Sequence, residues 1–319
     1  MDSFHPTVPQ IADFLLYLFK DRNLAVSTVQ GYKSAIASTI KQATGTELGS
    51  SPVLRDLLSS FFLERPRSQF QLPQWDLALV LRCLLRPPFE PMANAELRYV
   101  TLKTVFLLTL AAGKRRGEMH ALLDTVQHTE GWTSVTIRPS PTFLAKTHVL
   151  SNPAGAFTEV TVPALTQIVD RSEPDARLCP VRALRFYLDR TKALRQGRSK
   201  PCKLFISYKV GHKGDVRAPT ISAWIRKTVS EAYESVSEED AQLFTSGRAH
   251  ELRALSASWT AFRTLNLDQV FKAASWRAHT TFTSFYLRDM TLMSDDLLTL
   301  GPLVTSQMVV PGRGGSSSK

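Results

Sequence analysis

Apolar side chains recur at helical spacing through residues 1–68, and this repeat constrains the fold more than any other feature of the sequence. The recurring residues are first Ile11, Phe14, Leu15, Leu18 and Phe19, then Val29, Tyr32, Ile36 and Ile40, and finally Leu54, Leu57, Leu58 and Phe61. Apolar residues three and four positions apart line one face of a helix, and that face is buried against another element. The three stripes therefore predict a small helical bundle that leaves Lys33 and Lys41 on its outer face.

Two polar residues predict where helices of this bundle begin. Ser27 followed by Gln30 has the form of a capping box, in which each side chain bonds a free backbone N–H at the start of a helix. Ser51 followed by Pro52 fits an N-cap with proline at the first helical position. Both pairs predict helix starts beside the apolar stripes.

A polar, basic segment follows the bundle and predicts a domain boundary. It reads Arg65-Pro66-Arg67-Ser68 and leads to Pro73, a composition typical of linkers. We therefore divide the chain into domains at 1–68 and 69–310, with a disordered low-complexity tail at 311–319. Because the first helical pattern begins almost at Met1, we expect that a longer parent protein lost its start.

The second domain is expected to be helical with a small sheet inside it. Helical periodicity covers residues 77–85 and 97–110. The second run leads into the motif Gly113-Lys114-Arg115-Arg116-Gly117-Glu118, which is therefore expected at a helix end or at the start of the next helix. From Trp132 onward apolar residues alternate, at 135–137, 143–148 and 157–162, which predicts antiparallel strands with Lys146 on the middle segment or in the adjoining hairpin. Helical pattern then returns from Trp224 to Val270. The predicted fold class is mainly α with a small antiparallel β-sheet.

Charge and cysteine usage narrow the classes of function. The chain has 39 Lys and Arg against 28 Asp and Glu, a formal net charge of +11, which indicates a polyanionic partner such as nucleic acid or an anionic membrane surface. No apolar run approaches the ~18 residues of a membrane span, and the N-terminus lacks a signal-peptide pattern, so membrane and secretory classes are excluded.

Three cysteines without CxxC spacing fit neither a disulfide framework nor a zinc site, and they suit a reducing compartment. No phosphate-binding glycine loop or metal-ligand cluster is seen, so we expect no cofactor.

A set of reactive side chains follows one order along the sequence. Of the seven histidines only His250 has an arginine three residues later, Arg253, and that spacing places both on one face of a helix. Arg115 and Lys146 precede this pair, and Tyr286 alone of the seven tyrosines follows it. A phenol that attacks a phosphodiester needs cations on the phosphate oxygens, a base for its own proton and an acid for the leaving oxygen. These five residues are of the right types for that reaction.

In this order the chain resembles the tyrosine recombinase (phage integrase) family. The segment Thr28-Val29-Gln30-Gly31-Tyr32-Lys33-Ser34-Ala35-Ile36 is similar to a core-binding helix of the family's N-terminal domain, and 113–118 is similar to its first arginine motif. The blocks at 178–184, 250–259 and 281–289 resemble recombinases of eukaryotic DIRS-like and Crypton-like mobile elements. The resemblance implies a SAM-like helical core-binding domain at 1–68 and a tyrosine-recombinase catalytic domain at 69–310.

The resemblance also implies a role for each reactive residue. Arg115 and Arg253 would bind the nonbridging oxygens of the scissile phosphate, and Tyr286 would attack it to form a 3′-phosphotyrosine. Lys146 would protonate the leaving 5′ oxygen, and His250 would manage the tyrosine proton. These roles need no metal ion.

Two further positions are assigned by comparison with the family pattern. Glu118 would orient neighbours of Arg115, which the Gly-x-Arg-x-x-Glu register favours over Arg116. Trp276 occupies the region of the family's His/Trp residue, one residue further from the tyrosine than usual, with His279 as the alternative.

Basic residues outside this set are candidates for DNA contacts. The expected DNA-binding residues are Lys33, Lys41, Arg65, Arg67 and Arg182. Arg182 belongs to a cluster with Arg185 and Arg190 that fits either a contact with the phosphate backbone or a solvated helix face.

The leading hypothesis is a site-specific recombinase or integrase acting on double-stranded DNA, assembled as a tetramer and located in the nucleus. A catalytically silent DNA-binding relic and a type IB topoisomerase-like enzyme are the alternatives.

Overall fold

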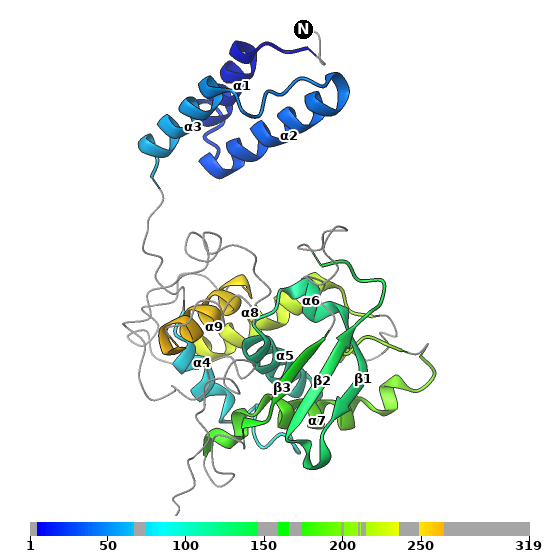
Figure 1. Ribbon diagram of the computed structural model, residues 1–319. Helices are drawn as coiled ribbons and strands as arrows, with labels where there is room; N and C mark the ends of the chain where they lie inside the picture. The colour runs from blue at the N-terminus through cyan, green and yellow to red at the C-terminus, as the bar shows by residue number, and fades with distance from the viewer. Residues whose placement is uncertain are drawn as a thin grey trace, which may run out of the picture. The chain divides into compact units, whose positions relative to one another are not determined.

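The computed structural model describes residues 5–66, 75–145, 159–165, 174–198, 201–209, 211, 215–235 and 249–264, with side chains of the last range described at 251–258. The chain separates into two compact units, Met1–Gln69 and Phe70–Lys319 (Figure 1).

The N-terminal unit contains three helices around one apolar core. They are α1 (Val8–Lys20), α2 (Val26–Thr44) and α3 (Pro52–Glu64). The predicted stripes supply most of the core, where the rings of Phe19 and Phe61 stack with centroids 4.0 Å apart. Phe14 and Tyr32, which belong to the same stripes, are exposed instead and meet edge to face.

The helix starts in this unit agree with the sequence at one position and differ at another. Ser51 is the N-cap of α3 and Pro52 its first residue, as predicted. Ser27 is not a cap, because α2 already begins at Val26 with Ala25 as N-cap. Burial of Val26 in the core explains the earlier start, since the helix must include it to present its apolar face.

The second unit is built around α5 (Leu97–Ala112), whose residues are buried on nearly every side. Helices α7, α8 and α9 and strand β3 pack against it. In Figure 1 strands β1 and β2 lie to the right of α5, and α4 and α9 lie to its left. The remaining helices of the described part are α4 (Leu77–Leu84), α6 (Arg116–Ala121), α7 (Pro180–Thr191), α8 (Ala218–Glu234) and α9 (Ala249–Thr264), with short 3-10 turns η1 (Glu130–Trp132), η4 (Pro174–Leu178) and η5 (Ala193–Arg195).

The sheet has the antiparallel order β1-β2-β3, with β1 at Leu122–His128, β2 at Ser134–Pro139 and β3 at Val160–Pro163. Strands β2 and β3 match the predicted alternation, but the pattern did not indicate β1. The strand expected over 143–148 is wrong for residues 143–145, which lie outside any strand, and its remainder lies outside the described residues. Pairing with β2, in which Leu122 lies opposite Pro139, fixes β1 where its own sequence is only weakly alternating.

The predicted fold class, mainly α with a small antiparallel sheet, is confirmed. All three cysteines are free thiols, so no disulfide links the chain. Within the part of the chain that the structure describes, no helix has the length and apolar character needed to cross a bilayer.

Candidate functional site

The turn between α5 and α6 places the first arginine motif. Gly113 ends α5 with φ of +58°, a left-handed conformation that favours glycine. A Cβ at Gly113 would also lie 3.3 Å from Ser256 Oγ on α9. Two residues later Arg115 is the N-cap of α6, so the motif joins a helix end to a helix start, as predicted.

Glu118 holds Arg115 at the start of α6 through two contacts. The Glu118 carboxylate accepts the backbone N–H of Arg115 at 2.8 Å and its Nη1 at 2.9 Å. A carboxylate in the first turn of a helix is also stabilised by the free N–H groups there. The guanidinium of Arg115 is about one-fifth exposed, so it is fixed by Glu118 while remaining open to a ligand.

Helix α9 brings Arg253 to the same carboxylate. Arg253 is 1% exposed and donates from Nη1 to the Gly113 carbonyl at 2.7 Å, across 140 residues of sequence. The same Nη1 lies 3.7 Å from Glu118 Oε2. Ser256 Oγ, one turn later on α9, donates to the Leu110 carbonyl at 2.8 Å. The end of α5 therefore docks on α9 through two hydrogen bonds that place both arginines around Glu118.

Lys114 adds a third cation to this group. It is 6% exposed, and burial lowers its pKa from 10.5 to about 8; the charge of Glu118 opposes this shift, while Arg253 and Arg115 add to it. The four side chains, which we call the Glu118 cluster (Lys114, Arg115, Glu118 and Arg253), thus contain three basic groups and one carboxylate.

The structure describes two of the six predicted catalytic side chains, Arg115 and Arg253, and it brings them together. His250 lies on α9 with Arg253, but its side chain is outside the described residues. Lys146, Trp276 and Tyr286, with the alternative His279, also fall outside the described part of the chain. Their roles stay predictions.

The candidate DNA-binding residues of the N-terminal unit have partners within that unit. Lys33 Nζ donates to the Gly49 carbonyl at 2.7 Å, and Lys41 pairs with Glu47. Arg65 lies over the Phe19 ring, 3.6 Å from its centroid, and donates to Asn23 Oδ1 at 2.8 Å. Arg67 lies outside the described residues.

Arg182 belongs to a second buried carboxylate. Its guanidinium forms a bidentate ion pair with the Glu90 carboxylate, with N–O distances of 2.6 and 3.1 Å. Lys103 Nζ donates to the same carboxylate at 2.6 Å and to the Leu84 carbonyl at 2.7 Å. Burial would raise the pKa of Glu90, but the hydrogen bonds from Arg182 and Lys103 outweigh it and hold that pKa below its usual range. We call these three side chains the Glu90 cluster (Glu90, Lys103 and Arg182).

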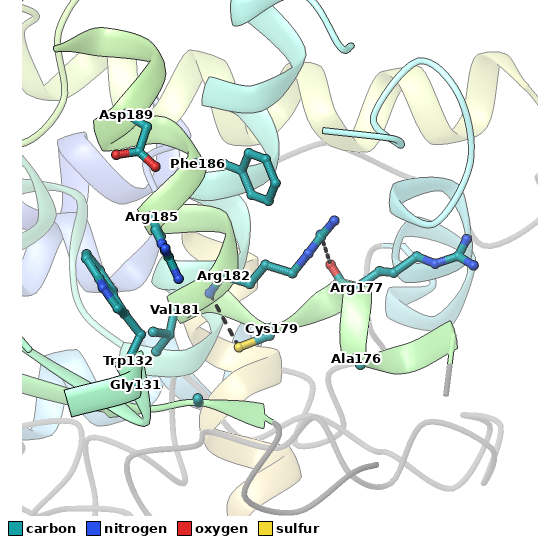
Figure 2. Close-up of a pocket in the computed structure, with 11 residues that line it drawn as sticks. Gly131, Trp132, Ala176, Arg177, Cys179, Val181, Arg182, Arg185, Phe186 and Asp189 are labelled. Atoms are coloured by element: carbon teal, nitrogen blue, oxygen red, sulfur yellow. Dashed lines mark hydrogen bonds between the residues drawn. The ribbon is translucent and has the colours of Figure 1, made fainter. Parts of the chain in front are cut away.

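The two clusters lie at different ends of the sheet. Arg182 lines a cavity of about 510 Å³ with Trp132, Arg185 and Phe186 (Figure 2). Trp132 lies in the turn between β1 and β2, whereas α6 joins the opposite end of β1 (Figure 1). At about 3.3 Å per residue, the strand separates these ends by roughly 20 Å. The structure therefore does not bring Arg182 together with Arg115.

The roles of Lys114, Glu90 and Lys103 were not predicted from the sequence. Lys114 stands inside the first arginine motif, so its position was the available signal. No sequence signal joined Glu90 to Lys103 and Arg182, because the three come from separate segments.

No protein-family model matches the chain, and no curated protein matches it. Among solved structures, it is similar to a lambda integrase fragment dimer bound to a COC′ core site (13% identity, TM-score 0.49, covering 92% of this chain and 83% of that one). It is also similar to a lambda integrase tetramer bound to a Holliday junction, with 13% identity, a TM-score of 0.49, and coverage of 92% of this chain and 67% of that one. A third similar structure is XerA recombinase, with 14% identity, a TM-score of 0.42, and coverage of 97% of this chain and 85% of that one. The chain thus has structural similarity to tyrosine recombinases at low identity. A likeness of this degree assigns neither an activity nor a residue role to this chain.

Proposed function

We propose that the chain is a tyrosine-type recombinase that cuts and rejoins double-stranded DNA through a 3′-phosphotyrosyl intermediate. The observation that carries the proposal is the Glu118 cluster, in which Arg115 and Arg253 come from distant segments to one buried carboxylate. Two guanidinium groups beside each other suit the nonbridging oxygens of one phosphate, because each donates two hydrogen bonds in a plane.

Charge supports an anionic substrate at this cluster. Arg253 is almost fully buried and Arg115 is about one-fifth exposed, so both guanidinium groups are held in place before a ligand arrives. A phosphodiester gains negative charge on its equatorial oxygens as it is attacked, so cations that are already in place stabilise the transition state without reorganising. Their arrangement therefore favours phosphoryl transfer over simple backbone binding.

The chemical steps follow from the predicted roles. The Tyr286 oxygen attacks phosphorus, the P–O5′ bond breaks, and the 5′ oxygen leaves as a hydroxyl with a proton from Lys146. The phenol proton passes to His250. Because the phosphotyrosyl bond keeps the phosphoester, the 5′ hydroxyl of a second strand can reverse the step and join a new partner.

The finer parts of the proposal rest on the sequence resemblance. They are a core-binding domain at 1–68 that clamps duplex DNA with the catalytic domain at 69–310, a tetramer on DNA, an origin in a eukaryotic DIRS-like or Crypton-like element, and action in the nucleus. The contacts expected from Lys33, Lys41, Arg65, Arg67 and Arg182 belong to this part. Terminal repeats flanking the gene would support the mobile-element origin.

Covalent trapping on DNA tests the activity. The wild-type protein should form a covalent adduct with a nicked suicide duplex, and it should do so in EDTA because arginines take the place of metal ions. Tyr286→Phe lacks the attacking oxygen and should bind the same duplex without an adduct.

The outcomes separate the alternatives. DNA binding without an adduct from wild type would indicate a silent relic, and an adduct that persists in Tyr286→Phe would disprove the assignment. Relaxation of supercoiled DNA without joining of two sites would indicate a topoisomerase.

A further inference from the structure

The cavity at the start of α7 takes no part in the reaction as proposed. Its volume is about 510 Å³, within the range of ~300–1,000 Å³ that is typical of small-molecule sites. Its walls include the turn between β1 and β2, the 3-10 turn η4, and the face of α7 that carries Arg182, Arg185, Phe186 and Asp189 (Figure 2). Because these segments belong to different elements, the packing of the fold shapes the cavity.

Trp132 is held in the cavity wall in an unusual backbone conformation. Its φ is +57°, in the left-handed region that a bulky side chain rarely adopts, and it follows Gly131 at +70°. The Trp132 N–H donates to the Thr129 carbonyl at 3.0 Å, and Thr129 Oγ1 accepts the N–H of Ser134 at 2.9 Å. The indole stacks on the ring of His128, with centroids 4.1 Å apart and planes 13° apart. The indole is therefore fixed in advance, which lowers the entropy lost when a ligand binds against it.

Arg185 covers the same indole loosely. Its guanidinium carbon lies 5.7 Å from the indole centroid. In Figure 2 its side chain points toward Trp132 and away from Asp189, which follows one turn later on α7. Planar groups in contact lie about 3.5–4.0 Å apart, so a ring placed between two of them needs roughly 7 Å. A small rotation of the exposed Arg185 side chain therefore opens a slot for a planar ring.

The charged side chains of the cavity favour an anion. Three arginines line it, Arg177, Arg182 and Arg185, against one carboxylate, Asp189. The side chains of Arg177 and Arg182 extend on the side of the cavity away from Trp132 (Figure 2). Guanidinium groups stack on aromatic rings and donate paired hydrogen bonds to phosphate oxygens. The cavity therefore suits a molecule with a flat ring at one end and a phosphate at the other.

We propose that this cavity binds a nucleotide, with its base between the Trp132 indole and the Arg185 guanidinium and its phosphate toward Arg177 and Arg182. Stacking accepts any base, because every base has a π-face, so the cavity selects for the ring and the phosphate more than for one base. This site is independent of the proposed function, since the cavity shares no residue with the Glu118 cluster and lies at the other end of the sheet.

Titration of the full chain with 2′-deoxyadenosine 5′-monophosphate tests the proposal. Saturation-transfer difference NMR detects binding with a Kd as weak as millimolar, and the protons of the base should receive the strongest transfer because two side chains enclose them. Deoxyadenosine lacks the phosphate and inorganic phosphate lacks the ring. Each should bind about 10-fold or more weakly than the nucleotide, the effect of losing one stacking or charge-assisted contact.

Substitutions then locate the site. Arg185→Gln removes the charge at an exposed position, and Trp132→Leu removes the ring; each should raise Kd by about 10-fold. Arg226→Gln makes the matched exchange at an exposed arginine of α8 outside the cavity and should leave Kd unchanged. Arg253→Lys alters the Glu118 cluster and should also leave Kd unchanged. Circular dichroism checks the fold, and if Trp132→Leu does not fold, Arg185→Gln decides alone.

Weaker binding in Arg185→Gln with unchanged binding in Arg226→Gln supports the nucleotide site. Absence of saturable binding in the millimolar range overturns it, and so does inorganic phosphate that binds as tightly as the nucleotide. Binding that survives in Arg185→Gln but is lost in Arg253→Lys overturns it too, because the nucleotide then occupies the Glu118 cluster. These outcomes leave the recombinase proposal to its own test, the covalent adduct on DNA.

Discussion

The Glu90 and Glu118 clusters both hold a buried carboxylate, but they pair it with different cations. Glu90 is met by Lys103 and Arg182, and Arg182 is about one-third exposed, so that water stabilises the extra positive charge. Glu118 is met by two arginines, Arg115, which is about one-fifth exposed, and Arg253, which is almost fully buried. The difference teaches that a lysine paired with an arginine suits a structural ion pair, whereas two guanidinium groups, with five N–H donors each, suit the oxygens of a phosphate.

The largest expected effect is on stability in the Glu90 cluster. Glu90→Gln leaves Lys103 buried without its counter-ion, and removing one partner of a buried pair costs about 3–5 kcal/mol. Urea unfolding at pH 7 measures the loss. Glu159→Gln breaks an exposed pair with Arg138 and should cost at most about 1 kcal/mol. Similar losses in both variants would mean that the Glu90 cluster does not hold the fold.

Next in size is an effect on chemistry in the Glu118 cluster. Arg253→Lys keeps a charge but loses the planar fork, and removing one preorganised donor to a transition-state oxygen slows a reaction by about 10²–10³-fold. The rate of adduct formation on suicide DNA measures this, with circular dichroism as the check on folding. Arg182→Lys makes the matched exchange in the Glu90 cluster and should change stability more than rate. A slower reaction in Arg182→Lys together with a loss of stability alone in Arg253→Lys would contradict these roles for the two clusters.

The pH dependence of stability sharpens the comparison further. The pKa of Lys103 is about 8 in the folded protein against an ordinary value of 10.5. Between these values the unfolded chain binds more protons, so this lysine makes the free energy of unfolding rise with pH. Lys103→Met removes that contribution, on the order of 3 kcal/mol at about 1.4 kcal/mol per pKa unit. Unfolding curves from pH 7.5 to 10.5 should therefore converge or cross, whereas parallel curves would show that Lys103 keeps an ordinary pKa.

The smallest expected effect is on the salt dependence of DNA binding. Lys41 pairs only at the surface, with Glu47, and can turn to a phosphate at little cost. Lys41→Gln should lower the slope of log K against log salt by ~0.9, the value for one phosphate contact. Arg182→Gln should lower it less, since Glu90 holds that guanidinium. An equal decrease of the slope in both variants would indicate that Lys41 and Arg182 both contact a DNA phosphate.

Local patterns were enough to predict α1 to α5, α8 and α9, the pair Ser51-Pro52 and the helix boundary at Gly113-Arg115, but they did not predict α7. The same reasoning missed β1, because Leu122–His128 follows a helix directly and gains its structure from pairing with β2. It also placed a cap at Ser27, where burial of Val26 decided the helix start instead. Hydrogen bonds to a neighbouring strand and burial in a core are set by segments that a local pattern does not contain.

The sequence by itself determined the fold class, the helical bundle at its start, and the residue types able to handle a phosphodiester. Only the tertiary structure decided which cations meet which carboxylate. Arg115 and Arg182 both stand in basic segments near a helix start, yet one meets Glu118 and the other Glu90. Helical periodicity depends on residues three and four positions apart, so a local stretch of sequence contains it. The partner of a buried charge instead comes from whichever segments the packing of α5, α7 and α9 brings within hydrogen-bonding distance.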